Sequence, residues 1–161
     1  MQDRFIFNAI VTGYYDIDTP DEYKEVEPQI YLHNVDVFSD EIGIDYDRLL
    51  AEVEKQLKLD KPEISQVMQF FEDNSNASDF EYVTIKPDKI LQCTGLKDKN
   101  GKLIYELDYV RYSNNTYKVE IDKFFGISLT NISNGDTIIM DDIVLFNCEV
   151  IGNEFESNTK I

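Results

Sequence analysis

Residues 80–161 consist of short apolar runs separated by turn sequences, and this alternation limits the fold more than any other feature of the chain. The runs at 103–112, 117–121 and 137–145 are rich in β-branched and aromatic residues. Asn100-Gly101 and Asn134-Gly135 are turn dipeptides that tolerate positive φ angles. Strands of about five residues, with turns about every 8–12 residues, predict an all-β half folded as a small barrel or sandwich.

Residues 1–79 combine strand and helix patterns. Over 29–38 apolar and polar residues alternate as in a strand, and over 47–57 the apolar residues form one stripe at helical spacing. Asp60 is placed to cap a second helix, with Glu63 three residues later as its capping-box partner. We therefore expect a mixed region with two short helices, which makes the whole chain an α+β protein.

The two halves also differ in charge, which predicts two domains. Residues 1–79 hold 19 acidic and 6 basic side chains, a balance of −13, whereas residues 80–161 hold 13 and 9, a balance of −4. The polar stretch 73–79 has no apolar periodicity and is the natural seam. We expect an acidic N-terminal α+β domain over 1–79 and a β domain over 80–161.

The acidic balance limits the partners that this chain can bind. With 32 acidic and 15 basic residues the net charge is −17, while a 42% hydrophobic content is enough for a buried core. This charge repels phosphate backbones and anionic lipids, so neither direct nucleic-acid binding nor membrane association is expected. The expected charged partner is a basic protein, above all one that normally holds nucleic acid.

Two segments carry a resemblance to a known family. Residues 94–102 read T-G-L-K-D-K-N-G-K, and residues 149–156 read E-V-I-G-N-E-F-E. Over about residues 90–158 the chain resembles the YopX family of small phage and prophage proteins. The resemblance implies a small SH3-like β-barrel at the C-terminus, a phage or prophage origin, and no established catalytic residue. Leu107 stands where the family has glycine, which alters the expected turn, and the helical pair over 47–71 lies outside the resemblance.

The start of the chain and its apolar runs predict where the protein works. The first residues lack the basic leader and small-residue cleavage site of a signal peptide. No apolar stretch reaches the ~18 residues that a membrane span needs. Together with the phage resemblance, this predicts a protein of the bacterial host cytoplasm, in which Cys93 and Cys148 are reduced and buried.

The residue pattern gives no sign of an active site. His33 is the only histidine, and it falls in a strand pattern rather than beside a nucleophile. The chain has no glycine-rich phosphate loop, no Cys-x-x-Cys pair and no histidine-based metal spacing. We therefore predict no catalytic residue and no cofactor.

One acidic segment resembles a calcium loop without meeting its geometry. Asp16, Asp18 and Glu27 fall at the first, third and twelfth positions of such a loop. Pro20 stands at the fifth position, and Asp21 replaces the glycine that the sharp turn requires. We therefore predict no metal site, although a metal-dependent hydrolase built on these acids remains a further hypothesis.

The expected binding surface is this same segment, in which tyrosines alternate with acids. Tyrosines supply contact area and carboxylates attract a basic partner. The alternative is a mobile acidic loop framed by Pro20 and Pro28. The candidate partner-binding residues are Tyr14, Tyr15, Asp16, Asp18, Asp21, Glu22, Tyr23, Glu25 and Glu27.

A second candidate contact is the predicted hairpin tip that carries Lys97, Lys99 and Lys102, the densest positive spot of the chain. The alternative here is a solvated turn without a partner. If the lysines do contact a ligand, nucleic-acid recognition through this tip is a local hypothesis that opposes the global charge.

These observations favour a non-enzymatic phage or prophage accessory protein that binds a host or phage protein. The expected target is a host enzyme that handles nucleic acid, such as a restriction or CRISPR nuclease. An acidic surface inhibits such an enzyme by imitating nucleic acid in its basic groove. The alternative is a self-assembling structural or scaffold protein, a homo-oligomer whose sheet edges pair between copies.

Overall fold

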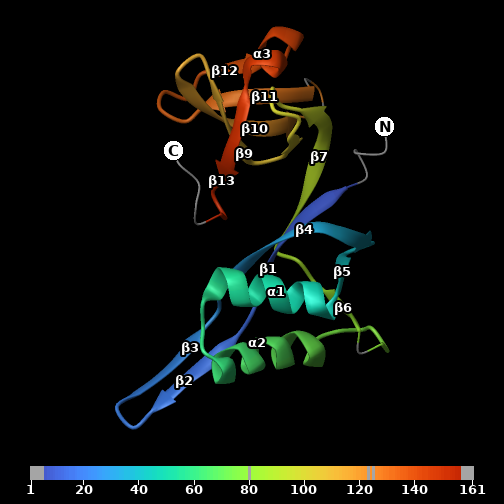
Figure 1. Cartoon of the computed structure of the whole chain (residues 1–161), viewed down its shortest axis with the longest axis vertical. Helices are drawn as coiled ribbons and strands as arrows, with labels where there is room; N and C mark the ends of the chain where they lie inside the picture. The colour runs from blue at the N-terminus through green and yellow to red at the C-terminus, as the bar shows by residue number, and fades with distance from the viewer. Residues whose placement is uncertain (1–5, 80, 123, 125, 157–161) are drawn as a thin grey trace. The chain divides into compact units, whose positions relative to one another are not determined.

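The computed structural model describes residues 6–79, 81–122, 124 and 126–156 (Figure 1). These residues form two compact units: the N-terminal unit, residues 7–90, and the C-terminal unit, residues 91–156 together with Ile6. Within the described ranges, no helix is both long enough and apolar enough to cross a membrane. The domains 1–79 and 80–161 stay a prediction, and Phe80, with which the second begins, lies outside the described residues.

The N-terminal unit is built on four antiparallel strands in the order β6-β5-β4-β1. Their bounds are Phe7–Thr12 for β1, Gln29–Phe38 for β4, Glu41–Asp45 for β5 and Tyr82–Ile85 for β6. Alternate side chains point to one face, as the strand period of two requires. That face forms the core of the unit with Val11, Ile30, Leu32, Ile42, Ile44 and Val83.

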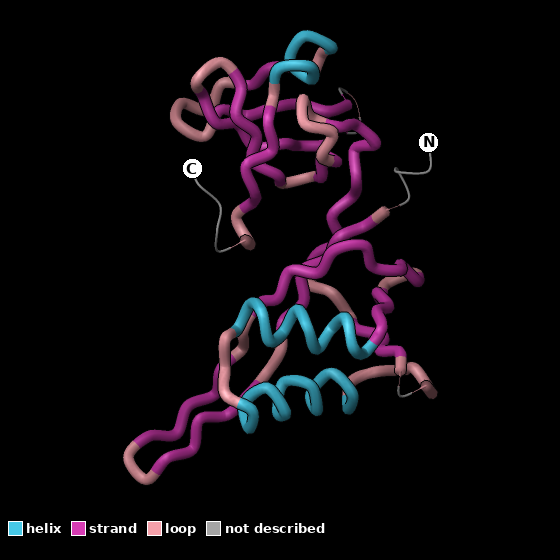
Figure 2. The backbone as a smooth tube through the Cα atoms, in the orientation of Figure 1, coloured by secondary structure: helices cyan, strands magenta, loops and turns pink. Residues whose placement is uncertain are grey.

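Two helices cover the apolar face of this sheet, α1 (Tyr46–Leu57) and α2 (Lys61–Asp73), as Figure 2 shows. Their apolar stripes enter the core through Leu49 and Val53 of α1 and through Val67 and Phe71 of α2. The Asp60 carboxylate accepts a hydrogen bond from the Glu63 amide at 3.2 Å, so the predicted cap and the predicted helix pair are confirmed. A further antiparallel pair, β2 (Tyr15–Thr19) and β3 (Glu22–Val26), extends from this unit.

The C-terminal unit contains an antiparallel pair and a five-stranded antiparallel sheet. The strand β7 (Lys89–Lys97) enters the unit and pairs with β8 (Leu103–Tyr105). The sheet has the order β12-β11-β10-β9-β13. Its strands are β9 (Asp108–Tyr112), β10 (Asn115–Asp122), β11 (Gly126–Asn131), β12 (Thr137–Ile139) and β13 (Glu149–Asn153).

The expected SH3-like barrel is wrong, because this sheet is open. Its outer strands β12 and β13 lie at opposite ends of the strand order and do not pair with each other. The α+β class is wrong as well, since 13 strands and only three helices occupy the described ranges, and the protein is mostly β.

A helix replaces the strand that the sequence predicts over 137–145. Only Thr137–Ile139 is extended, and α3 (Asp142–Asn147) follows. Asp141 ends the strand because its carboxylate accepts a hydrogen bond from the Val144 amide at 2.9 Å and caps this helix. The second part of the predicted strand is therefore helical, and β12 is a three-residue edge strand.

The turn before β9 has a residue in the left-handed backbone conformation, although that residue is leucine and not glycine. Leu107 has a φ of +67°, in the left-handed region that favours glycine, and its amide donates to the Val119 carbonyl at 2.9 Å. The Leu107 side chain is buried, at 8% exposure. Burial of this side chain offsets a backbone cost of about 1–2 kcal/mol.

Candidate functional site

The acidic tyrosine-rich segment is an ordered β-hairpin, formed by β2 and β3. Asp16 lies opposite Glu25 and Asp18 lies opposite Tyr23 in the pairing register. Pro20 and Asp21 form the turn, which the Thr19 hydroxyl closes by accepting from the Glu22 amide at 3.1 Å. The segment is therefore a pair of hydrogen-bonded strands rather than a mobile acidic loop. We call residues 14–27 the acidic hairpin.

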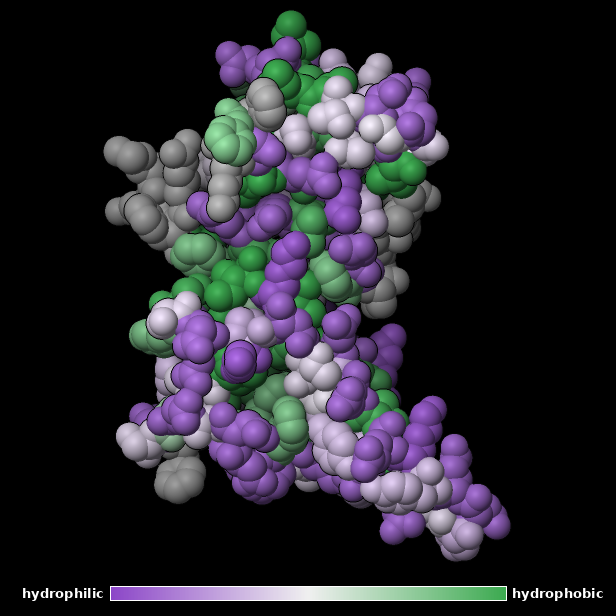
Figure 3. Space-filling model, turned by 180° about the vertical axis from the view of Figure 1, so that it is seen from behind, coloured by the Kyte–Doolittle hydropathy of each residue, from purple (hydrophilic) through white to green (hydrophobic). Residues whose placement is uncertain are grey.

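The register gives the acidic hairpin two different faces. Tyr15, Ile17 and Val26 share one face; Tyr15 is buried and the other two are half-buried against the core of the N-terminal unit. The opposite face carries Tyr14, Asp16, Asp18, Tyr23 and Glu25. Tyr23 is 65% exposed, and Figure 3 shows the hairpin as a hydrophilic projection at the lower right.

The structure therefore brings together eight of the nine predicted binding residues and places the ninth in the core. Asp18, Asp21, Glu22, Tyr23, Glu25 and Glu27 are exposed, and Tyr14 and Asp16 are half-buried at the base. Tyr15 is only 8% exposed and serves packing rather than contact with a partner.

The base of the acidic hairpin is fixed to α2. Gln66 bridges the backbone of Asp16: its Oε1 accepts from the Asp16 amide at 2.7 Å, and its Nε2 donates to the Asp16 carbonyl at 3.3 Å. The Tyr14 ring lies 6.0 Å from the ring of Phe70. Gly13 allows this approach, because a Cβ there would lie 3.0 Å from Val67 Cγ1. Gln66 lies outside the apolar stripe of α2, so no pattern in the sequence indicates its contact with the hairpin.

The outer face of the acidic hairpin holds a strong negative field. Residues 14–27 contain six carboxylates and one lysine, Lys24, which leaves −5 of the net −17 on one two-stranded element. The Tyr14 and Tyr23 hydroxyls donate to Asp16 and Glu25, respectively. Each hydrogen bond, reinforced by the nearby carboxylates, raises the pKa of its tyrosine, so both rings stay neutral donors at physiological pH.

The turn that carries Lys97, Lys99 and Lys102 is held by hydrogen bonds to the buried carboxylate of Asp98. Asp98 is 6% exposed, and its carboxylate accepts from the amides of Asn100 at 2.8 Å, Lys102 at 2.9 Å and Val150 at 2.8 Å. Val150 belongs to β13, so this one side chain joins the T-G-L-K-D-K-N-G-K segment to the closing E-V-I-G-N segment. No local pattern in the sequence indicates this role of Asp98, because Val150 lies far from the turn along the chain.

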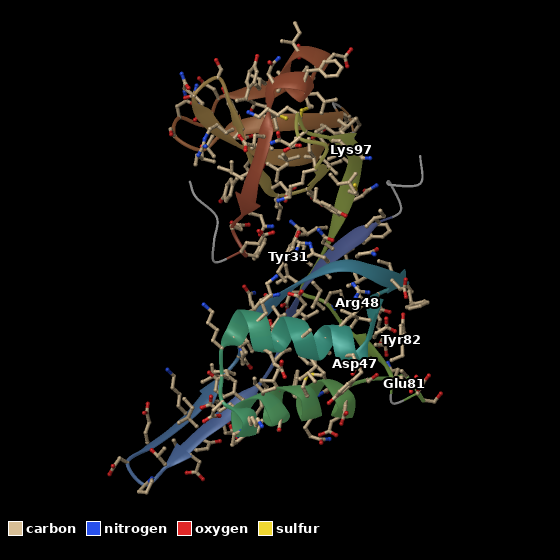
Figure 4. All side chains as sticks on the ribbon, in the orientation of Figure 1. Tyr31, Asp47, Arg48, Glu81, Tyr82 and Lys97 are labelled. Carbon is tan, nitrogen blue, oxygen red and sulfur yellow. The ribbon has the colours of Figure 1, made fainter. Side chains whose placement is uncertain are left out.

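The three lysines themselves point to solvent around this joint. Lys97, Lys99 and Lys102 are exposed, and Lys97 is labelled in Figure 4. Lys99 Nζ lies 3.3 Å from Glu149 Oε2, an exposed ion pair of little energetic weight. The arrangement explains the motif as a structural turn and gives it no positive surface comparable to the acidic hairpin.

The residues considered for chemistry have structural surroundings. The His33 ring lies edge-on to Tyr31 at 4.5 Å, and Cys93 and Cys148 are buried free thiols. Within the ranges that the structure describes, no group of three or more His, Cys, Asp or Glu residues is placed to hold a metal ion.

A family model described as YopX protein matches residues 47–161, more than half of the chain. The match begins in the first turn of α1, so the helix pair lies inside the matched region, and the expectation that it lies outside the resemblance is wrong. The acidic hairpin and strands β1 to β5 precede the matched region. No curated protein matches the chain.

Proposed function

The chain belongs to the YopX family of phage-type proteins, and from this we propose that it is a non-enzymatic accessory protein that binds a basic nucleic-acid enzyme of the host through its acidic hairpin. Binding to the groove that normally holds nucleic acid would inhibit that enzyme. Restriction and CRISPR nucleases are the expected targets, because their grooves are built to attract phosphates.

The observation that carries this proposal is the density of charge on the acidic hairpin. Five-residue strands span about 17 Å. The four carboxylates within these two paired strands give about one charge per 4 Å over that length, close to the one charge per about 3.4 Å on one strand of duplex DNA. The anchored base holds this charge in place, which lowers the entropic cost of binding.

The acidic hairpin also lies outside the region that matches the family. Its position before residue 47 favours a role that is particular to this chain, while the matched region supplies the scaffold that anchors it. Tyr23, 65% exposed on the acidic face, offers contact area beside the charge.

The test begins with capture of partners by the full chain from a bacterial host lysate, at low and at high salt, with identification by mass spectrometry. The captured enzyme is then titrated with the chain in the presence of duplex DNA. We expect an affinity that falls steeply with salt and is competed by DNA. An affinity indifferent to both would show that nucleic-acid mimicry is wrong.

Matched variants separate the acidic hairpin from the general charge. The hairpin variant carries Asp18→Asn, Asp21→Asn, Glu22→Gln and Glu25→Gln, and its affinity should fall by at least about tenfold. The control removes four exposed acids elsewhere, by Asp40→Asn, Glu54→Gln, Glu72→Gln and Asp73→Asn. Equal losses in the two variants would contradict a specific role of the acidic hairpin.

A second candidate function, self-assembly, is favoured by an exposed apolar patch next to an open edge. The edge strand β12 ends at Ile139, which is 65% exposed, and α3 adds Ile143 at 66% and Phe146 at 74%. Two copies that pair along β12 would bury these side chains. A dimeric mass that becomes monomeric in Phe146→Glu would support this function, and a monomeric wild-type mass at micromolar concentration would exclude it.

A further inference from the structure

The solvent face of β4, β5 and β6 carries a second surface, separate from the acidic hairpin. In the register Asp36 lies opposite Gly43, Gly43 lies opposite Thr84, and Asp45 lies opposite Tyr82. Since Ile42, Ile44 and Val83 point into the core, these residues share the face that points away from it.

Tyr82 is held flat on this face. A Cβ at Gly43 would lie 2.0 Å from the Tyr82 hydroxyl oxygen, so only glycine leaves room for the ring there. The hydroxyl reaches across β5 and donates to Asp36 Oδ2 at 2.7 Å. The ring is thus fixed at both ends, and its position on β6 can be followed in Figure 4.

The ring of Phe38 packs edge-on against the ring of Tyr82, and we call these two rings the aromatic corner. Phe38, at the end of β4, has its ring centroid 6.5 Å from that of Tyr82 at an angle of 79°. Phe38 is 51% exposed. A rigid ring with a perpendicular neighbour offers a flat face on which a planar cation can stack.

The corner forms part of a hollow of about 650 Å³, whose other walls combine four acids with the uncharged Asn76, Ala77, Ser78 and Thr84. Glu41, Asp45, Asp79 and Glu81 line it, and no lysine or arginine of the described residues does. The neighbouring Arg48, labelled in Figure 4, donates to the backbone carbonyls of His33 and Asn34 at 2.7 and 3.1 Å. The pKa of Tyr82 is raised to about 12, by burial first and then by Asp36 and Asp45.

We propose that this hollow binds an arginine side chain of a partner protein, with the guanidinium stacked in the corner of Phe38 and Tyr82 and paired with the carboxylates around it. Arginine fits better than lysine because its planar, weakly hydrated group stacks on rings and donates to two carboxylates at once. Charge complementarity selects this occupant, since the lining residues that the structure describes include four acids and no lysine or arginine.

The test uses the full chain and two end-blocked peptides, Gly-Arg-Gly-Arg-Gly and its lysine counterpart, with binding followed by NMR titration at low salt. We expect the arginine peptide to bind more tightly and to shift the Tyr82 ring protons. Phe38→Ala removes one wall without changing the charge and should weaken arginine-peptide binding about three- to tenfold. Phe124→Ala removes a phenylalanine that is 90% exposed in the C-terminal unit, and should leave binding unchanged.

A second pair of variants separates the hollow from the acidic hairpin. Asp45→Asn with Glu81→Gln removes two charges from the hollow, and Asp21→Asn with Glu22→Gln removes two from the hairpin. The first pair should weaken peptide binding more than the second. Equal effects of the two pairs, equal effects of Phe38→Ala and Phe124→Ala, or no preference for arginine would each overturn the proposal. None of these results decides whether the acidic hairpin binds an enzyme.

Discussion

Asp98 shows how a single buried carboxylate can explain a sequence motif. The turn dipeptide Asn100-Gly101 was predictable from local chemistry, because such pairs tolerate positive φ, and Gly101 has a φ of +81°. The function of Asp98 was not predictable, because its partner Val150 lies 52 residues away in the sequence. Local patterns do not report long-range hydrogen bonds.

We predict that Asp98→Ala destabilises the protein by about 3 kcal/mol, since it removes charge-assisted bonds and leaves the buried Val150 amide without an acceptor. Urea unfolding of the two proteins measures the difference. Asp40→Ala, at an exposed turn, is the control and should change the free energy of unfolding by less than about 0.5 kcal/mol. If Asp98→Ala lowers the free energy of unfolding no more than the control does, the hydrogen bond from Val150 to Asp98 does not stabilise the fold.

Asp108 is a buried carboxyl that couples stability to pH. It is 4% exposed, and burial raises its pKa from 3.8 to about 7, although the Tyr105 amide donates to it at 2.8 Å. Lys102 lowers this pKa and Glu156 raises it. Because the folded state holds the proton more tightly, the contribution of Asp108 to stability is complete below about pH 4 and is lost as the pH rises through about 7.

We therefore predict that Asp108→Asn gains stability relative to wild type as the pH rises, by at most about 4 kcal/mol between pH 4 and pH 8. Asparagine imitates the protonated carboxyl and cannot ionise. Melting temperatures of both proteins at pH 5 and pH 8 test this, since the general repulsion of the chain cancels in the difference. A difference that does not change with pH would mean that Asp108 titrates normally.

At the scale of elements, the acidic hairpin depends on α2, whose Gln66 lies 50 residues beyond Asp16 in the sequence. Gln66 makes both of its hydrogen bonds to the backbone of Asp16. Gln69, one turn later on α2, bonds only to Asp73 of the same helix. Substitution of Gln66, with substitution of Gln69 as the control, therefore measures how much the bonds to Asp16 stabilise the base of the hairpin.

We predict that Gln66→Ala raises the hydrogen-exchange rate of the Asp16 amide by about fivefold or more, which corresponds to the loss of about 1 kcal/mol of local protection. Gln69→Ala should leave that rate unchanged. Two-dimensional NMR of both variants measures it directly. Equal exchange at Asp16 in the two variants would show that ring packing alone holds the hairpin base.

The helices show where sequence reasoning works and where it fails. The helices α1 and α2 were predictable because each is 12 or 13 residues long and shows a full apolar stripe, with Asp60 capping the second. The helix α3 has six residues, and its apolar run reads equally well as a strand. Only the cap of Asp141 distinguishes the two, and one capping residue is a weak signal.

At the scale of the whole molecule, like charges dominate the electrostatics. The ion pairs Lys99–Glu149 and Lys118–Glu154 lie at the surface, with Lys118 half-buried, and are worth about 0–1 kcal/mol each. They are small beside the mutual repulsion within a net charge of −17. Repulsion of this kind is screened by salt.

We accordingly predict that raising NaCl from about 10 mM to about 200 mM increases the melting temperature by a few degrees. The hairpin variant with four neutralised acids should show a smaller increase, because less repulsion remains to be screened. Calorimetry of both proteins at the two salt concentrations gives the comparison. An unchanged or lower melting temperature in salt would show that the folded state does not carry net repulsion.

The strand content of the C-terminal unit was predictable, but its open sheet was not. Alternating apolar residues and turn dipeptides predict where individual strands lie, but not which strands pair with each other. Whether a sheet closes depends on which strands become neighbours, and here β13 joins β9 rather than β12. For the candidate site, composition identified the acidic residues, whereas only the pairing register shows that Tyr15 faces the core and Tyr23 faces solvent.

The bond from Asp98 to Val150 has a consequence for how the protein is made. At a synthesis rate of about 5–20 residues per second, the ribosome needs about 3–10 s to reach the partner that lies 52 residues beyond Asp98. Until Val150 emerges, Asp98 can satisfy only the amides of its own turn, and the edge of β9, once made, stays open until β13 follows. The nascent C-terminal unit is therefore exposed to proteases and to pairing with other chains until its last described strand emerges.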